Sequence, residues 1–252
     1  MAPVKAHLLH LLIVLSIATT VPSATSAQTG DSGRLTVFAA ASLTDVFPKI
    51  DALPRYGFAG SDQLSFQIQQ GAPADVFAAA SPKYPELLYK QGLVEKPVQF
   101  ATNTLVLIVP TSNPAGIRTV DDLTKPGVKL VVGDPSVPVG SYTRTVLGNL
   151  GIAAAALKNV VSQETDVRDV LGKVGLGEAD AGFVYLTDAK AVKGKVKVIA
   201  IRESAQPHVV YEAAVVKGSP RVGAAYRFLT RLLRPTAQRV LERAGFGPRP
   251  KP

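Results

Sequence analysis

The residues of this chain that suggest chemistry are small or carry a hydroxyl, and they stand where an apolar run gives way to a helix. Ser42 and Ser61 each follow a short apolar run, and Val139 and Val167 stand at two further helix starts. The first turn of a helix leaves backbone N–H groups without partners and carries a partial positive charge. Such helix ends bind anions without any basic side chain, so the pattern indicates an oxyanion site.

The same residues have a plainer interpretation as ordinary helix caps. Serine is a common N-cap because its hydroxyl accepts a hydrogen bond from an unpaired N–H group. In parallel α/β sheets, however, the carboxyl ends of the strands gather at one edge, where ligands bind. Two hydroxyls and two N–H groups that converge there would suit a fully deprotonated oxyanion. The residue pattern by itself leaves both interpretations open.

The chain contains few of the residues that catalysis and metal binding require. It has no cysteine, and of its three histidines His7 and His10 lie in the apolar N-terminal segment. A serine hydrolase built on Ser42 or Ser61 would therefore have to use His208, in a polar stretch, as its base. A histidine-rich metal site is excluded. We predict a binding protein that is not an enzyme and needs no cofactor, with an exported serine hydrolase as an alternative.

Apolar runs and helix-like stretches alternate along the chain from Leu35 onward. The apolar runs predict strands at 35–41, 56–59, 75–80, 104–109, 129–132, 181–185, 196–201 and 209–216. Capping residues and closing glycines predict helices that begin at Ser42, Ser61 and Thr165, and others over 85–91, 141–150 and 220–243. This alternation predicts mainly parallel α/β sheets flanked by helices, and a length of 252 residues favours two of them.

The N-terminus has the three parts of a secretory signal. Lys5 supplies a positive start, an apolar run covers 8–18, and small residues end at Ala27. The run is shorter than the roughly 20 apolar residues that span a bilayer. We predict a signal peptide over 1–27 and a flexible mature N-terminus over 28–34. Because a chain without cysteine offers no lipid-anchor site, we expect a soluble protein exported to the periplasm or another extracytoplasmic space.

The formal net charge of the chain is +9. A basic balance is one sign of nucleic-acid binding. Here the basic residues are spread along the chain, and their cluster near the C-terminus has the spacing of the wet face of an amphipathic helix. We therefore expect no nucleic-acid partner, and we interpret the positive field as a means of drawing in anions.

Several segments together resemble the periplasmic molybdate-binding proteins of bacterial ABC transporters. They are VFAAASLT at 37–44, FAGS at 58–61, QGAPADVF at 70–77, VGDP at 132–135, VPVG at 137–140, DVR at 166–168 and GFVY at 182–185. The resemblance extends from about Leu35 to Gly247, and the combination of segments is specific. It implies a periplasmic-binding-protein-like fold of two lobes joined by two crossing strands, with the ligand in the cleft between them.

The resemblance also implies where the chain divides and what it does. The first lobe would comprise residues 35–102 and 212–250, and the second lobe residues 103–211. The protein would capture molybdate, and tungstate with it, as a monomer, and would deliver the ion to the membrane permease of an ABC importer. The other function kept open within this class is a receptor for another tetrahedral oxyanion such as sulfate.

The resemblance assigns the ligand contacts to five residues. They are the hydroxyls of Ser42, Ser61 and Tyr185 and the backbone N–H groups of Val139 and Val167, and the only metal involved is that of the bound oxyanion. All five are neutral donors. Molybdate is a dianion with no proton to give, so donors suffice, whereas a phosphate receptor would need a carboxylate to accept the proton of its ligand.

Three departures from the family pattern concern the site. The family has alanine where this chain has Val139, but only the backbone is used there. The stretch 47–58 is shorter than usual and contains Pro48 and Pro54, so we expect a short first helix. Asp62 follows Ser61 where small neutral residues are usual, and we expect its carboxylate to point outward and help cap the helix.

Overall fold

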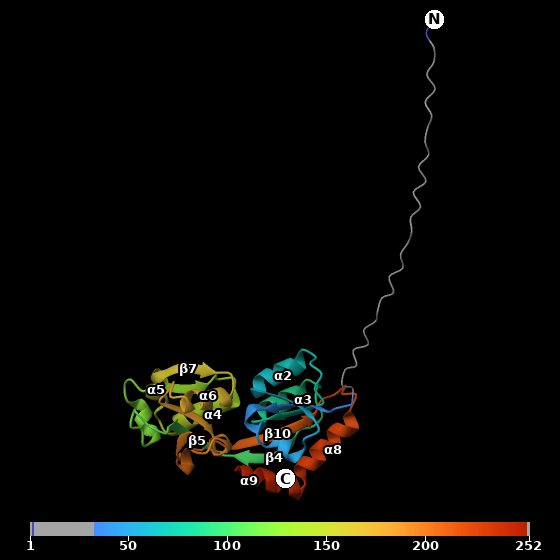
Figure 1. Ribbon diagram of the computed structural model, residues 1–252. Helices are drawn as coiled ribbons and strands as arrows, with labels where there is room; N and C mark the ends of the chain where they lie inside the picture. Colours follow the sequence, from blue (N-terminus) through green and yellow to red (C-terminus); the bar gives the residue numbers. More distant parts are fainter. Residues whose placement is uncertain (1, 3–32, 251–252) are drawn as a thin grey trace. The chain divides into compact units, whose positions relative to one another are not determined.

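The computed structural model describes residue 2 and residues 33–250, which form two five-stranded sheets flanked by helices (Figure 1). The strand order of the first sheet is β2-β1-β3-β10-β4, and that of the second is β7-β6-β8-β5-β9. The first sheet contains β1 (Thr36–Ala40), β2 (Arg55–Ala59), β3 (Val76–Ala79), β4 (Val98–Asn103) and β10 (Val209–Val215). The second contains β5 (Leu105–Pro110), β6 (Leu130–Gly133), β7 (Val160–Glu164), β8 (Ala181–Tyr185) and β9 (Val196–Ile199).

Both sheets follow one plan, in which a block of three parallel strands meets a strand of opposite direction. β1 pairs in parallel with β2 and β3, and β10 pairs antiparallel with β3 and β4. In the second sheet, β6 pairs in parallel with β7 and β8, and β5 pairs antiparallel with β8 and β9. The prediction of a two-lobed, mainly parallel α/β fold is confirmed. We call each sheet with its helices a lobe.

The helices pack against the sheet of their own lobe. α2 and α3 contact each other and the first sheet, α8 contacts β10, and α4 and α6 contact β6 and β8 of the second sheet. The helices of the first lobe are α1 (Phe47–Ile50), α2 (Ser61–Gln69), α3 (Lys83–Lys90), α8 (Val222–Leu233) and α9 (Pro235–Ala244). Those of the second are α4 (Pro138–Asn149), α5 (Ala153–Ala156), α6 (Val167–Gly175) and α7 (Leu186–Ala191). Short 3-10 turns lie at Ala41–Leu43, Val120–Thr124, Leu157–Asn159 and Glu203–Ala205.

The central strands are covered on both faces. Every residue of β5 and of β8 is buried, as is every residue of β3 and of β10. Strands that are covered on both sides become continuous apolar runs, which is why the sequence pattern located these four. β4 and β7, which the pattern did not predict, lie at sheet edges. Each contains exposed or half-buried residues among its buried ones, so neither forms a continuous apolar run.

Some sequence-based boundaries differ from the structure. α4 begins at Pro138 and not at 141, so Val139 and Gly140 lie in its first turn. The prediction that Ser42 opens a helix as its cap is wrong, because Ser42 lies inside a 3-10 turn that has no side-chain cap. α1 spans four residues, which confirms the short first helix.

Two expectations about the organisation of the chain stay predictions. The predicted signal peptide over 1–27 lies outside the described residues apart from residue 2, and so does most of the segment 28–34 that we predict to be flexible. The division of the lobes at 102–103 and 211–212 falls within β4 and β10, the two neighbouring strands of the first sheet from which the chain enters and leaves the second. Among the described residues, no helix is long and apolar enough to span a membrane.

The aspartate of the segment QGAPADVF ties the first lobe together. One oxygen of the buried Asp75 carboxylate accepts the Thr36 N–H at 2.7 Å, and the other accepts the Ser219 hydroxyl at 2.6 Å. Arg221 approaches the same carboxylate at 3.5 Å. Asp75 therefore connects the start of β1 with the loop between β10 and α8.

We expect Asp75→Asn to destabilise the protein by about 1–3 kcal/mol, because the amide replaces an acceptor with a donor that faces other donors. Urea unfolding monitored by circular dichroism measures this change. The matched control is Asp121→Asn, an exposed carboxylate in a 3-10 turn, for which we expect a change within about 0.5 kcal/mol. Equal stability of the two variants would contradict the structural role of Asp75.

Candidate functional site

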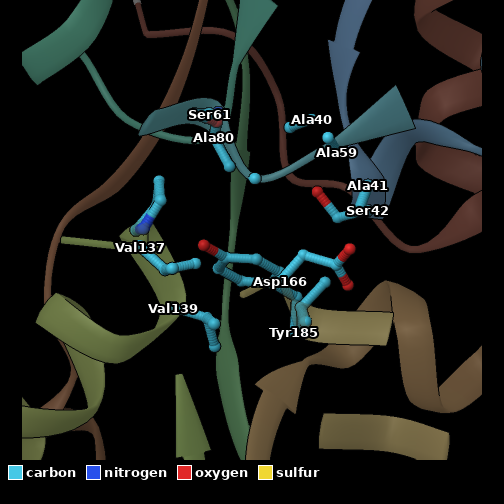
Figure 2. Close-up of a pocket in the computed structure, with 13 residues that line it drawn as sticks. Ala40, Ala41, Ser42, Ala59, Ser61, Ala80, Val137, Val139, Asp166 and Tyr185 are labelled. Carbon is cyan, nitrogen blue, oxygen red and sulfur yellow. Dashed lines mark hydrogen bonds between the residues drawn. The ribbon is translucent and has the colours of Figure 1, made fainter. Parts of the chain in front are cut away.

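A small cavity lies between the two lobes, at the carboxyl ends of the parallel strands. Its volume is about 10 Å³, on the scale of the space that a single buried water needs. The residues that line it are Ala40, Ala41, Ser42, Ala59, Gly60, Ser61, Ala80, Val137, Pro138, Val139, Asp166, Val167 and Tyr185 (Figure 2). All five residues predicted as ligand contacts are among them.

Each of these five residues stands at the end of a strand. Ser42 follows β1, Ser61 is the first residue of α2 after β2, and Tyr185 is the last residue of β8. Val139 lies in the first turn of α4 after β6, and Val167 is the first residue of α6 after β7. The plan shared by the two sheets therefore brings groups from both lobes to one point, and all five residues are buried.

The N–H groups of Val139 and Val167 belong to helix first turns, where no intrahelical acceptor exists. The Asp166 carboxylate caps α6 by accepting the N–H groups of Arg168 at 2.6 Å and Asp169 at 3.2 Å. The cap satisfies the second and third N–H groups of the helix and leaves the first one, that of Val167, at the cavity wall.

The first turn of α4 is held against the end of β6 by a close backbone approach. A Cβ atom at Gly140 would lie 2.1 Å from the Asp134 carbonyl oxygen and 2.3 Å from that of Gly133, so only glycine fits there. This contact fixes the position of the preceding residue, Val139. Val139, whose side chain is larger than the alanine of the family pattern, is among the residues that line the cavity.

The hydroxyl of Ser61 is oriented to donate into the cavity. Its oxygen accepts the Ala80 N–H at 3.1 Å. A backbone N–H group can only donate, so the Ser61 oxygen is the acceptor in this bond and the hydroxyl hydrogen is available to another partner.

The hydroxyl of Ser42 is oriented in the same sense by a chain of buried hydrogen bonds. The Thr104 N–H donates to Asn103 Oδ1 at 2.9 Å, which places the amide nitrogen of Asn103 toward the Tyr211 hydroxyl at 3.4 Å. That nitrogen can only donate, so the Tyr211 oxygen accepts from it. The Tyr211 hydroxyl lies 2.8 Å from Ser42 Oγ in a bond that either hydroxyl can donate, and when Tyr211 donates, the hydrogen of Ser42 is left for a ligand.

Tyr185 contributes the third hydroxyl. The side chain is 1% exposed, and within residues 33–250 its hydroxyl has no hydrogen-bond partner. An unpartnered buried hydroxyl costs free energy, and a ligand in the adjacent cavity would satisfy it. Burial raises the pKa of Tyr185 well above 10, and the neighbouring Tyr211 and Tyr142 add to the shift, so the group is a neutral donor.

The electrostatics of the cavity are unusual for an anion site. No lysine, arginine or histidine is among the described residues that line it, and Asp166 is the one carboxylate there. Burial raises the pKa of Asp166, against the lowering effect of the two N–H groups that it caps. The cavity therefore offers neutral donors to a ligand, arranged before the ligand arrives, and suits a small anion that has no proton to donate.

Direct contacts join the lobes on both sides of the cavity. On one side, the Ser136 hydroxyl donates to Asp62 Oδ2 at 2.9 Å, and the Tyr84 hydroxyl donates to the Ser136 carbonyl. On the other side, Arg168 forms an ion pair with Asp45. The expectation that Asp62 caps α2 is wrong, because its carboxylate makes no cap and instead contacts the other lobe, although it does not line the cavity.

Behind Arg168 lies a second, fully buried carboxylate, that of Asp188. Arg168 Nε is 3.4 Å from Asp188 Oδ1, close enough for Coulomb attraction, although neither atom makes a hydrogen bond in the described part of the chain. Asp188 Oδ2 accepts the Tyr185 N–H at 3.2 Å. Burial raises the pKa of Asp188 to about 7, and Arg168 and the Tyr185 N–H limit the rise.

Sequence reasoning missed several residues that support the site. Asn103 and Tyr211 orient Ser42 from β4 and β10, and Gly60 and Asp62 meet the second lobe. The only available signal was that Asp62 departs from the family pattern. His208, the one histidine that a hydrolase could use, is exposed in a loop and does not line the cavity.

Comparison with known proteins agrees with this architecture. A family model described as bacterial extracellular solute-binding protein matches residues 35–247. Molybdate-binding protein ModA of Mycobacterium tuberculosis is 40% identical over 234 residues, covering 89% of this chain and 88% of the relative. ModA of Escherichia coli is 34% identical, covering 86% and 90%. The periplasmic molybdate-binding protein of Azotobacter vinelandii, 24% identical, aligns with a TM-score of 0.74 over 84% of this chain and 98% of that one.

The protein has a two-lobed α/β fold with a small, donor-lined cavity between the lobes. This combination is typical of solute-binding proteins, which take up a ligand in the cleft between two lobes. The chain belongs to the bacterial extracellular solute-binding protein family. The resemblance to molybdate-binding proteins inferred from the sequence segments is confirmed over nearly the whole region from Leu35 to Gly247.

We expect the raised pKa of Asp188 to appear in the pH dependence of stability. Between its unfolded pKa near 4 and its folded pKa of about 7, the folded state binds more protons than the unfolded state, so the contribution of Asp188 to stability falls as pH rises. Relative to Asp188→Asn, the wild type should lose up to about 1.4 kcal/mol per pH unit across this window. Urea unfolding of both proteins at pH 5, 6 and 7 measures the difference, and parallel pH profiles would contradict it.

Proposed function

We propose that this chain captures molybdate, and tungstate with it, between its lobes and delivers the ion to the membrane permease of an ABC importer. The observation that carries the proposal is the set of five neutral donors around one small cavity. Molybdate is a tetrahedral dianion without a proton, so it can accept from every donor and has nothing to repel them. The names of the relatives from M. tuberculosis and E. coli support the same ligand.

Discrimination against other tetrahedral oxyanions follows from two properties of the cavity. Hydrogen phosphate carries a proton that needs a strong acceptor, and the single carboxylate in the described lining is that of Asp166, one oxygen of which is engaged by α6. Sulfate has the charge and shape of molybdate but is smaller, so donors that are fixed by backbone packing and by the bond to Tyr211 would meet it at longer distances. Sulfate is the alternative ligand of the same site.

The cellular setting belongs to the proposal too. The signal-like N-terminus and membership of an extracellular solute-binding family support an exported protein that meets its ligand outside the cytoplasmic membrane. The sequence contains no cysteine that could carry a lipid anchor. We propose that the protein acts as a monomer, because one chain supplies every donor around the cavity.

Titration calorimetry of the mature protein with molybdate, tungstate, sulfate and phosphate at neutral pH tests the proposal. We expect tight binding of molybdate and tungstate, weak binding of sulfate and none of phosphate. Three variants test the donors: Ser61→Ala, Tyr185→Phe and Tyr211→Phe. Each should weaken molybdate binding by about 10- to 100-fold, because each removes a hydrogen bond to a charged ligand or the group that orients one.

The control for these variants is Tyr226→Phe, which removes a hydroxyl from an exposed tyrosine of α8 and should leave the affinity unchanged. Absence of binding by any of the four anions would overturn the proposal. Retained affinity in all three donor variants would show that the ion binds elsewhere. Hydrolysis of an ester substrate that is lost in His208→Ala would instead favour the serine hydrolase.

Closure of the lobes depends on Gly60. Any residue can adopt the backbone conformation of Gly60 (φ −57°, ψ 139°). A Cβ atom at this position, however, would lie 2.4 Å from the Thr165 carbonyl oxygen of the second lobe. We expect Gly60→Ala to fold normally and to bind molybdate at least about tenfold more weakly, because the closed state becomes less populated. Calorimetry measures the affinity, and small-angle X-ray scattering with the ligand measures closure.

The matched control for closure is Gly148→Ala in α4, where a Cβ meets nothing within 4 Å. This variant should close and bind as the wild type does. If Gly60→Ala also closed fully and kept the wild-type affinity, the contact between Gly60 and Thr165 would have no part in binding.

A further inference from the structure

A second cavity adjoins the ligand cavity and has the opposite chemical character. Its volume is about 200 Å³, and Ser42 lines both cavities. Four basic side chains line it, against the single carboxylate of Asp45. They are Lys49, Arg168, Lys190 and Arg243.

The four basic groups differ in whether their charge is compensated. Arg168 pairs with Asp45 and lies against Asp188, so its charge is largely balanced. Lys49, Lys190 and Arg243 are exposed, and within the described part of the chain none of them makes a hydrogen bond or an ion pair with a side chain. The cavity therefore holds about three uncompensated positive charges next to a site without any.

The position of Lys190 links the two lobes. Its side chain extends from the end of α7 to Gly245, where the left-handed backbone (φ 102°) ends α9, and a Cβ at that glycine would lie 3.0 Å from Nζ. The carbonyl end of a helix carries partial negative charge and favours a cation there. Lys190 thus comes from the second lobe, and Lys49 and Arg243 come from the first.

A site of neutral dipoles holds a dianion well at contact distance but attracts it weakly from afar, because a charge–dipole interaction decays faster with distance than a charge–charge interaction. Cations inside the small cavity would attract the ion, but they would have to be desolvated there, at a cost. Cations that stay hydrated beside the cavity supply the long-range attraction without that cost. The two cavities divide these tasks: the small cavity presents neutral donors, and the larger cavity beside it holds the cations.

We propose that Lys49, Lys190 and Arg243 form an anion-collecting vestibule, which attracts the dianionic oxyanion to the cleft and speeds its capture without touching it once it is bound. This inference rests on the proposed function and adds a site that acts on the association rate. Because the charges come from both lobes, they also flank the cleft when the lobes are apart.

The test is the association rate of molybdate with the mature protein. The chain has no cysteine, so Ser141→Cys at an exposed position of α4 provides one attachment point for an environment-sensitive dye, present in every variant. Stopped-flow fluorescence then gives association and dissociation rates at about 10 mM and 150 mM ionic strength, where the Debye length falls from about 30 Å to 8 Å.

For the triple variant Lys49→Gln, Lys190→Gln, Arg243→Gln we expect an association rate about tenfold lower at low ionic strength, with the dissociation rate within about twofold. The difference should shrink at about 150 mM ionic strength. The control carries the same change of net charge at exposed lysines outside both cavities, Lys90→Gln, Lys158→Gln and Lys197→Gln. Its association rate should fall by less than about threefold.

Equal losses in the two triple variants would overturn the vestibule, because overall charge would then explain the rate. A change confined to the dissociation rate would overturn it too, because the cations would then contact the bound ion. If the wild type binds molybdate and the association rate is unchanged in the triple variant, the vestibule fails while the proposed function stands. Failure of the wild type to bind any oxyanion would remove both.

Discussion

The proposed site depends on one constraint: each of its five donor groups must present a hydrogen, and not a lone pair, to the cavity. A backbone N–H meets this condition by its nature, but a hydroxyl does so only if another donor occupies its oxygen. The Ala80 N–H does this for Ser61, and the Tyr211 hydroxyl can do it for Ser42. The two sheets and their crossing strands bring these partners together, so the fold serves to fix the direction of a few hydrogens.

The sequence predicted the parts of this arrangement that are local. An apolar run followed by a serine and a helix-like stretch identifies Ser42 and Ser61 as strand-end positions, and helix-start signals identify Val139 and Val167, because these signals are local in the sequence. The two-lobed α/β fold followed from the same alternation. The family resemblance added Tyr185, which ends a buried strand and has no local signal of its own.

The parts that escaped prediction depend on contacts between distant segments. Asn103 and Tyr211 orient Ser42 from strands that are separated in sequence by the whole second lobe, and neither has a distinctive neighbour. Gly60 has an ordinary backbone conformation, and the space for a Cβ atom is taken by the Thr165 carbonyl oxygen of the other lobe and by the side chain of Asp62. The Asp62 carboxylate lies outside the cavity lining, as a pocket for a dianion requires, but its partner Ser136 comes from the other lobe and has no local sequence signal.

Neutrality of the binding cavity and positive charge beside it are two consequences of the same physics. A dianion that is buried among fixed dipoles needs no counterion, and a counterion inside would have to be dehydrated each time the cleft closes. The contacts between the lobes, Asp62 with Ser136 and Asp45 with Arg168, involve residues close in sequence to the proposed ligand residues. Closure and the proposed ligand contacts would therefore involve the same helix starts, and a ligand that satisfied the donors would also stabilise the closed arrangement of the lobes.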